Sequence, residues 1–155
     1  MSGHRGAADR QLPNLGMLRK VVVAFAVGMA LSAARTRPAQ AYYSATWYED
    51  AAGYEKALRD QRIHHVPIFV YFRVDWCPHC RAFDDLAEAY EVRSKLNAVI
   101  KVHVNPEHGA AEKALQAQYG SSSYPALFLQ PDGGAPTSLS AKGPAANFIA
   151  QLPEQ

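Results

Sequence analysis

The chain has 155 residues, with 16 Lys and Arg against 14 Asp and Glu and only two cysteines. A formal net charge of +2 without a basic stripe argues against a nucleic-acid-binding protein. There is no internal repeat and no long low-complexity linker, so the length suits a leader followed by one domain.

The first 41 residues have the features of an export signal. Arg19 and Lys20 form a basic flank, and residues 21–31 form an apolar core that is too short to span a bilayer comfortably. The segment Ala39-Gln40-Ala41 matches a signal-peptidase cleavage pattern. We therefore predict a signal peptide at 1–41, with Met17 as a possible start.

Cleavage after Ala41 leaves residues 42–155, which carry ten basic and 13 acidic side chains, so the basic character belongs to the leader. The mature protein is then expected to be periplasmic or otherwise exported, where disulfides persist. An uncleaved leader that anchors the protein in a membrane is the alternative. Nothing suggests a dimerisation segment, so a monomer is expected.

Residues 42–155 alternate helical and strand patterns. Residues 68–73 are apolar on both faces, which is typical of a central strand. The order of elements predicts an α/β fold with a central mixed β-sheet flanked by helices. In chain order the patterns predict a loose entry segment at 42–46, a helix at 47–61, a strand at 68–73, a helix at 78–96 with Cys80, Phe83, Leu86, Ala87 and Tyr90 on its apolar stripe, a strand at 99–104, a helix at 106–119 closed by Gly120, a strand at 125–130, a turn at 131–134, a strand at 137–141 and a last short helix opened by Gly143-Pro144.

The two cysteines, Cys77 and Cys80, follow Trp76 and enclose Pro78 and His79. This spacing between a strand and a helix is typical of a redox-active dithiol. Cys77 is expected to cap the helix, where unpaired N–H groups and the helix dipole lower a thiol pKa from about 8.5 to between about 3.5 and 7. Pro78 suits the first helical position, and Cys80, one turn on, is placed to resolve a mixed disulfide.

Other interpretations of the pair are weaker. A structural disulfide would close so small a ring that it constrains little of the unfolded chain. A haem attachment motif requires histidine directly after Cys80, where the chain has Arg81. A zinc site lacks a second C-x-x-C pair. Four histidines are available as further ligands, but they belong to no motif and are predicted to be surface or strand-edge residues: His64, His65, His103 and His108.

The segments Trp76-Cys77-Pro78-His79-Cys80 and Tyr124-Pro125-Ala126-Leu127-Phe128, in this order of elements, resemble the thioredoxin-like fold family over nearly all of 42–155. The resemblance implies that Pro125 is cis and packs beside the cysteines, the alternative being an ordinary trans proline. It also implies that a substrate peptide binds along the backbone of Tyr124. The predicted substrate-binding residues are Trp76, Pro78, Tyr124 and Pro125.

The dipeptide between the cysteines is similar to that of DsbA, the periplasmic disulfide-forming enzyme, and the likeness extends through Phe83-Asp84-Asp85. Two departures matter. Residues 78–125 leave no room for the helical insertion of DsbA-type proteins. In addition, Tyr71 occupies the place, six residues before Cys77, where these families keep a buried carboxylate as proton acceptor. Asp75 is nearer the cysteine pair, but it is expected to be too exposed to serve as the proton acceptor in place of the missing carboxylate.

These features predict an exported protein thiol-disulfide oxidoreductase, in which Cys77 attacks, Cys80 resolves and His79 stabilises the Cys77 thiolate. The dithiol is itself the redox centre, so no cofactor and no metal are expected. The expected partners are substrate proteins with thiols or disulfides and a membrane redox partner. The direction of exchange is open, because His79 favours an enzyme that oxidises its substrates, whereas the insertion-free architecture favours a reductase. We slightly prefer the oxidant. The alternative is a metal carrier that binds copper or zinc through the two cysteines and a histidine.

Overall fold

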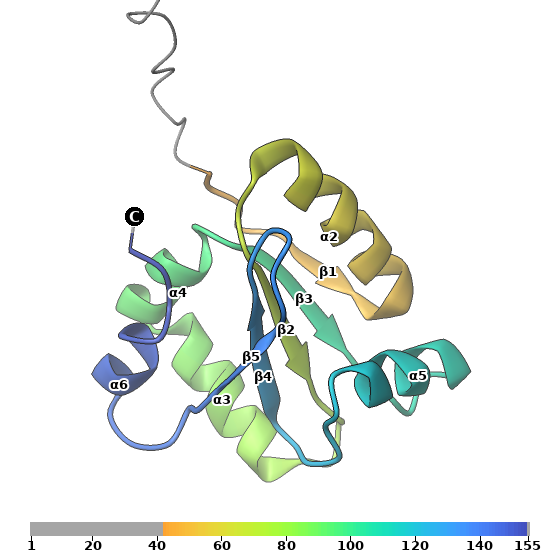
Figure 1. Ribbon diagram of the computed structural model, residues 1–155. Helices are drawn as coiled ribbons and strands as arrows, with labels where there is room; N and C mark the ends of the chain where they lie inside the picture. The colour runs from red at the N-terminus through yellow and green to blue at the C-terminus, as the bar shows by residue number, and fades with distance from the viewer. Residues whose placement is uncertain (1–41, 155) are drawn as a thin grey trace, which may run out of the picture. The chain divides into compact units, whose positions relative to one another are not determined.

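The computed structural model describes residues 42–154, which form a five-stranded mixed sheet with helices on both faces (Figure 1). In chain order the elements are β1 (Trp47–Glu49), α2 (Asp50–His64), β2 (Ile68–Phe72), α3 (Pro78–Glu88), α4 (Tyr90–Leu96), β3 (Ile100–Val104), α5 (Ala110–Gln118), β4 (Ala126–Gln130), β5 (Thr137–Leu139) and α6 (Ala145–Ile149). The strand order is β1-β3-β2-β4-β5. β1 and β2 each run parallel to β3, whereas β4 runs antiparallel to both β2 and β5.

The sheet separates two apolar clusters. One cluster joins α3, α4 and α6 to one face of the sheet, and Phe69 and Leu127 belong to it. The other cluster joins α2 and α5 to the opposite face, and Val70 and Phe128 belong to it. Because successive side chains of a strand point to opposite faces, β2 contributes to both clusters and is buried along its whole length. The predictions of a central β2 and of an α/β mixed-sheet fold are confirmed.

The helix predicted at 47–61 is wrong at its beginning. Residues 47–49 form β1, which pairs in parallel with residues 101–103 of β3. The helix α2 begins only at Asp50, whose carboxylate Oδ1 accepts the backbone N–H of Asn105 at 3.0 Å. The pairing partner lies far along the chain, so helical spacing in the local sequence could not reveal this strand.

Residues 78–96 form two helices instead of the predicted single one. At Ala89, where ψ is 134°, the chain turns and α4 begins at Tyr90. The turn lets α4 bury Val92 and Leu96, and it leaves Tyr90 78% exposed. The prediction that Tyr90 continues the apolar stripe of the active-site helix was therefore wrong.

The entry segment at 42–46 is attached to the sheet rather than loose. The N–H of Ser44 donates to the carbonyl of Asn97 at 2.9 Å, and the ammonium of Lys101 donates to the carbonyl of Ser44. Lys101 is buried on β3, where it also donates to Asn97 Oδ1 at 3.0 Å and to the carbonyl of Leu96 at 3.3 Å. Burial lowers the pKa of Lys101 to about 8. The attachment depends on a buried lysine whose partners only the fold brings together.

The remaining elements follow the predictions with shifted ends. α5 begins at Ala110 rather than at 106, because Asn105 forms a turn: its Oδ1 accepts the N–H of Glu107, and its carbonyl accepts the N–H of His108, both at 3.0 Å. Gly120 has a φ of 63° and ends α5 as predicted. The turn at 131–134 and the last helix are confirmed, and β5 ends before the predicted 141.

The predicted signal peptide at 1–41, with its cleavage site and its possible start at Met17, lies outside the residues that the structure describes. Within residues 42–154, no helix combines the length and apolar character needed to cross a membrane. The cleaved leader and the anchored alternative both stay predictions.

Candidate active site around the cysteine pair

Cys77 caps the N-terminus of α3, as predicted. Its backbone is extended, with φ −79° and ψ 112°, and Pro78 occupies the first turn. The N–H of Cys80 donates to the Sγ of Cys77 at 3.0 Å, so the sulfur takes the place of a capping oxygen. An N–H donor and the positive end of the helix dipole both favour negative charge on this sulfur.

The two cysteines form a disulfide, with their Cα atoms 5.2 Å apart. Both residues are almost fully buried, at 3% exposure for Cys77 and 0% for Cys80. His79, between them, is exposed. The pair is therefore capable of the dithiol–disulfide interconversion that its spacing predicts.

Trp76 lies next to the pair and is 64% exposed. Its indole N–H donates to Glu107 Oε1 at 3.0 Å, and its ring meets the Tyr124 ring edge to face, with centroids 6.2 Å apart. Because the ring is exposed and fixed by its contacts with Glu107 and Tyr124, it offers an apolar surface to a partner chain. Trp76 directly precedes Cys77 in the chain, and its predicted role in substrate binding stays a prediction.

The peptide bond between Tyr124 and Pro125 is cis, as the resemblance implied. Pro125 lines the same groove as His79, so the proline and the first turn of α3 lie side by side although they are far apart in the sequence. The structure thus brings together all the residues predicted for the site: Trp76, Cys77, Pro78, His79, Cys80, Tyr124 and Pro125.

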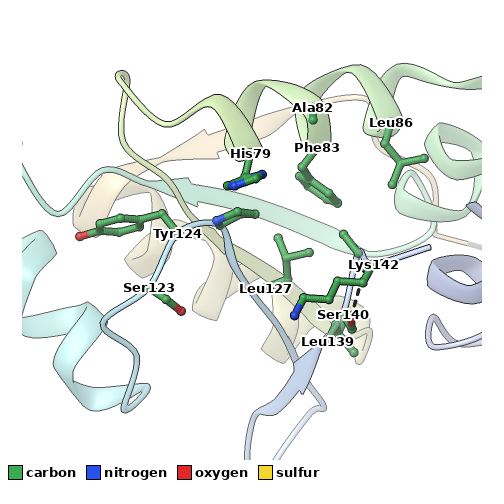
Figure 2. Close-up of a pocket in the computed structure, with 12 residues that line it drawn as sticks. His79, Ala82, Phe83, Leu86, Ser123, Tyr124, Leu127, Leu139, Ser140 and Lys142 are labelled. Atoms are coloured by element: carbon green, nitrogen blue, oxygen red, sulfur yellow. Dashed lines mark hydrogen bonds between the residues drawn. The ribbon is translucent and has the colours of Figure 1, made fainter. Parts of the chain in front are cut away.

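A groove of about 490 Å³ opens beside the pair, between α3 and the chain that follows β5 (Figure 2). Its surface is apolar and polar in similar shares, and Lys142 contributes a basic side chain. The twelve lining residues are His79, Ala82, Phe83, Leu86, Ser123, Tyr124, Pro125, Leu127, Leu139, Ser140, Ala141 and Lys142. The sequence analysis identified only three of them as site residues, because the rest come from four separate segments without a motif.

Tyr71 lies beneath the pair on the other side of α3. Its hydroxyl is 3.0 Å from Asp84 Oδ1 and 3.1 Å from the carbonyl oxygen of Cys80, so it donates its one proton to either acceptor. Burial and the nearby Asp84 charge raise the pKa of Tyr71. The phenol is therefore held neutral, and its hydroxyl contacts a carboxylate from α3.

Asp84 is also paired with Arg73, whose guanidinium lies 3.3 Å from Asp84 Oδ2 and 3.6 Å from Asp75 Oδ1. The side chain of Asp75 is 79% exposed, as expected, whereas that of Asp84 is 35% exposed. The sequence analysis did not assign Asp84 to the site. A usable signal was its position four residues after Cys80, one helical turn further along the same face.

This second side of α3 has its own hollow of about 300 Å³, which differs from the groove in its charged side chains. Arg73, Asp84, Glu88 and His103 contribute its charged and titratable groups, beside the rings of Trp47 and Tyr71 and the methyl group of Ala87. Desolvation by burial lowers the pKa of His103. The two sides of the active-site helix therefore differ in chemistry.

Three of the four remaining histidines lie at the surface, as predicted. His64 is exposed at the end of α2, His65 lies 2.7 Å from Asp132, and His108 lies 2.8 Å from Asp50. His103 was predicted wrongly, because it lies on an inner strand and stacks against Trp47 with its side chain 31% exposed.

Among residues 42–154, no group of three His, Cys, Asp or Glu side chains is arranged to hold a metal ion. His64 and His65 lie at the end of α2, His103 lies on β3 and His108 lies before α5, and each has a partner other than the cysteine pair. The metal-carrier alternative gains no support from this geometry.

Residues 45–154 match the thioredoxin family. Since this match covers well over half of the sequence, the chain belongs to the thioredoxin family, whose Cys-X-X-Cys spacing it also has. No protein with a curated description matches the sequence.

Solved structures support the same fold. The oxidised C-terminal domain of DsbD from Neisseria meningitidis is 21% identical with a TM-score of 0.60, over 68% of this chain and 96% of that one. A thioredoxin from Thermus thermophilus is 24% identical with a TM-score of 0.57, over 68% and 82%. The J-Trx1 fragment of ERdj5 is 18% identical with a TM-score of 0.54, over 68% of this chain and 47% of the fragment, so the chain spans about half of that fragment.

Proposed function

We propose that this protein exchanges disulfides with substrate proteins through Cys77 and Cys80. The observation that carries the proposal is the position of the Cys77 sulfur, which caps α3 and accepts the N–H of Cys80. The cis Pro125 and an open groove lie beside it, where a substrate chain can approach. The redox centre is the dithiol, so the reaction requires no further cofactor.

In the oxidising direction, a substrate thiolate attacks Cys77 Sγ and breaks its bond to Cys80, which leaves as a thiolate and takes up a proton. A second substrate thiolate then attacks the substrate sulfur of the mixed disulfide. The substrate disulfide forms, and Cys77 departs as a thiolate that the N-terminus of α3 stabilises. The same steps in reverse reduce a substrate disulfide. Trp76, Pro78, Tyr124 and Pro125 are the surface against which the substrate chain binds.

Substitution Cys80→Ser tests the proposal, because it removes the resolving thiol and keeps the nucleophile. The variant is expected to retain partner proteins as mixed disulfides that a reductant releases, seen as shifted bands on non-reducing gels. Cys77→Ser is the matched control and is expected to retain far less. Equal retention by the two variants, or none by either, contradicts the proposal.

For the direction of exchange we propose a disulfide donor. His79 places a basic side chain in the first turn of α3 next to Cys77, which favours the thiolate and hence the reduced form. Equilibration with glutathione measures the reduction potential. We expect a value nearer to about −120 mV, as for DsbA, than to about −270 mV, as for thioredoxin, and a shift toward the lower value in His79→Pro. A value near −270 mV makes the protein a reductase.

We also propose that the protein acts outside the cytoplasm, in the periplasm or an equivalent compartment, where a membrane redox partner reoxidises the pair. The leader pattern before Ala41 supports this location. Sequencing the N-terminus of the protein recovered from a periplasmic extract tests it. A chain beginning at Tyr42 agrees with the proposal, and an intact leader in the cytoplasmic fraction contradicts it.

A further inference from the structure

The groove beside the cysteine pair has features that favour particular substrates. Phe83 and Leu86 from α3 form one side, and Leu127 and Leu139 from the sheet form the floor and the opposite side. Its volume of about 490 Å³ lies within the range of sites that enclose most of a ligand, and its walls favour apolar side chains. His79, which lies between the two cysteines, and Pro125 both line the groove, so a chain bound in it passes close to the cysteine pair.

The charge of the groove is opposite to that of the domain. Residues 42–155 contain 13 acidic and ten basic side chains. Yet none of the twelve residues that the structure places around the groove is acidic, whereas Lys142 and His79 are basic. Figure 2 shows the Lys142 side chain along the wall that Leu139 and Ser140 form, across from α3. The hollow on the other side of α3 contains Asp84 and Glu88, whereas Asp85, the third acidic residue of this helix, is exposed and lines neither the hollow nor the groove.

We propose that this groove binds the segment next to the reactive cysteine of a substrate protein and selects segments in which an apolar side chain is accompanied by an acidic one. The apolar side chain packs against Phe83, Leu86 and Leu127, and the carboxylate pairs with the ammonium of Lys142. The inference rests on the proposed function, because the cysteine exchange holds the substrate in place.

The length of the groove indicates where the acidic residue lies. From His79 to Leu86 the helix rises by about 10 Å. An extended peptide covers about 3.3 Å per residue, so this distance corresponds to about three residues. The apolar residue is therefore expected one or two positions from the substrate cysteine. The acidic residue is expected within about three positions of the same cysteine.

The experiment uses the full chain with Cys80→Ser, its Cys77 loaded with thionitrobenzoate as a mixed disulfide. Seven-residue peptides with one cysteine displace the coloured thiol, and its release gives the rate. Each peptide carries leucine near the cysteine. Three positions from the cysteine it carries glutamate, glutamine or lysine. One set places these residues on the N-terminal side of the cysteine, and a second set places them on the C-terminal side. Each rate is divided by that of the same peptide with free Ellman's reagent, which removes the effect of the peptide charge on its own thiol.

We expect glutamate peptides of one set to react about two- to fivefold faster than lysine peptides, the size typical of one exposed ion pair. Lys142→Glu is expected to reverse this order. Lys56→Glu makes the same charge change on α2, on the opposite face of the sheet, and is expected to keep the order. Added salt should reduce the preference, and replacing the leucine by serine should slow every peptide.

Two results overturn the inference in distinguishable ways. If the corrected rates of glutamate, glutamine and lysine peptides are equal, or if Lys56→Glu changes the order as Lys142→Glu does, the groove does not select charge, although exchange at Cys77 stands. If no peptide reacts faster than 2-mercaptoethanol after the same correction, the proposed function fails and the inference fails with it.

Discussion

The two sides of the active-site helix α3 differ in what they offer. The side that faces the groove presents Phe83 and Leu86 and lies across from Lys142 (Figure 2). The other side carries the hydrogen bond between Tyr71 and Asp84 and the ion pair between Asp84 and Arg73. His79 of the groove lies between the cysteines, and Asp84 on the other side follows Cys80 by about one helical turn. One side is therefore suited to choose the substrate and the other to influence the charge of the sulfurs.

The side of Tyr71 and Asp84 also shows how the fold supplies a carboxylate without the usual residue on β2. A phenol with an ordinary pKa of about 10 has no charge at neutral pH, and the raised pKa of Tyr71 keeps it neutral at higher pH as well. Its hydroxyl instead lies between Asp84 and the carbonyl of Cys80. The carboxylate on this side of α3 therefore comes from the helix and not from β2. Substitutions on the Asp84 side of α3 should therefore alter the pKa of the Cys77 thiol, whereas substitutions in the groove should alter the preference among substrate peptides.

The largest expected effect comes from Phe83, because it separates the two sides. It is 2% exposed and packs against Tyr71, with ring centroids 4.8 Å apart, and against Phe148 at 5.4 Å. Phe83→Ala is expected to lower the free energy of unfolding by about 3–5 kcal/mol, measured by urea denaturation of the oxidised protein. Tyr90→Ala, at an exposed aromatic, should change it by less than about 0.5 kcal/mol. Similar losses in both variants would contradict the packing described.

The next effect separates the two sides by charge. Asp84→Asn removes a negative charge about one helical turn from Cys80 and leaves Arg73 paired with the exposed Asp75, and both changes favour a thiolate. We expect the pKa of the Cys77 thiol in the reduced protein to fall by a fraction of a unit, followed by ultraviolet absorbance against pH. The peptide charge preference in the groove should stay the same.

Asp85→Asn is the matched control, because Asp85 follows Asp84 on the same helix and is exposed. It is expected to shift the thiol titration less. If Asp85→Asn lowers the thiol pKa as much as Asp84→Asn does, the proximity of Asp84 is not the cause. If Asp84→Asn changes the peptide preference, the two sides of α3 are not independent.

The smallest expected effect is on the pH dependence of stability. It concerns His108, which lies outside both sides of α3, on the loop whose Glu107 accepts the indole N–H of Trp76. Asp50 accepts a hydrogen bond from His108 at 2.8 Å, which raises the pKa of His108 above 6.5. The pKa of Asp50 is lowered: burial opposes the shift, but the bonds from Asn105 and His108 outweigh it. A raised histidine pKa contributes stability that is full below 6.5 and is lost as the pH rises through the folded value. The Asp50 contribution is present above its ordinary pKa of 3.8 and is lost as the pH falls through the lowered value.

His108→Asn is therefore expected to flatten the dependence of stability on pH just above 6.5, measured by denaturant midpoints at several pH values. The change should be small, because the His108 side chain is 53% exposed. His65→Asn, at another exposed histidine paired with a carboxylate, is the control for a general loss of histidine charge. A steeper pH dependence in His108→Asn than in the original protein would contradict the direction given.

Much of the site could be predicted from local sequence because its chemistry is local. Cys77, Pro78 and Cys80 form their cap within one turn, so strand, turn and helix signals were enough to place them. The cis form of Pro125 came from the family resemblance, since nothing in the proline itself indicates it. Asp84 was missed because its partners, Tyr71 and Arg73, come from another element.

The sequence by itself determined the α/β class, the central β2 and the helix cap at Cys77, because hydrophobic periodicity and capping act between residues close in the chain. Only the tertiary structure decided that residues 47–49 form a strand, that the helix breaks at Ala89 and that Lys101 is buried. It also decided the difference between the two sides of α3. Each of these depends on contacts between segments distant in sequence, where packing and pairing outweigh local preference.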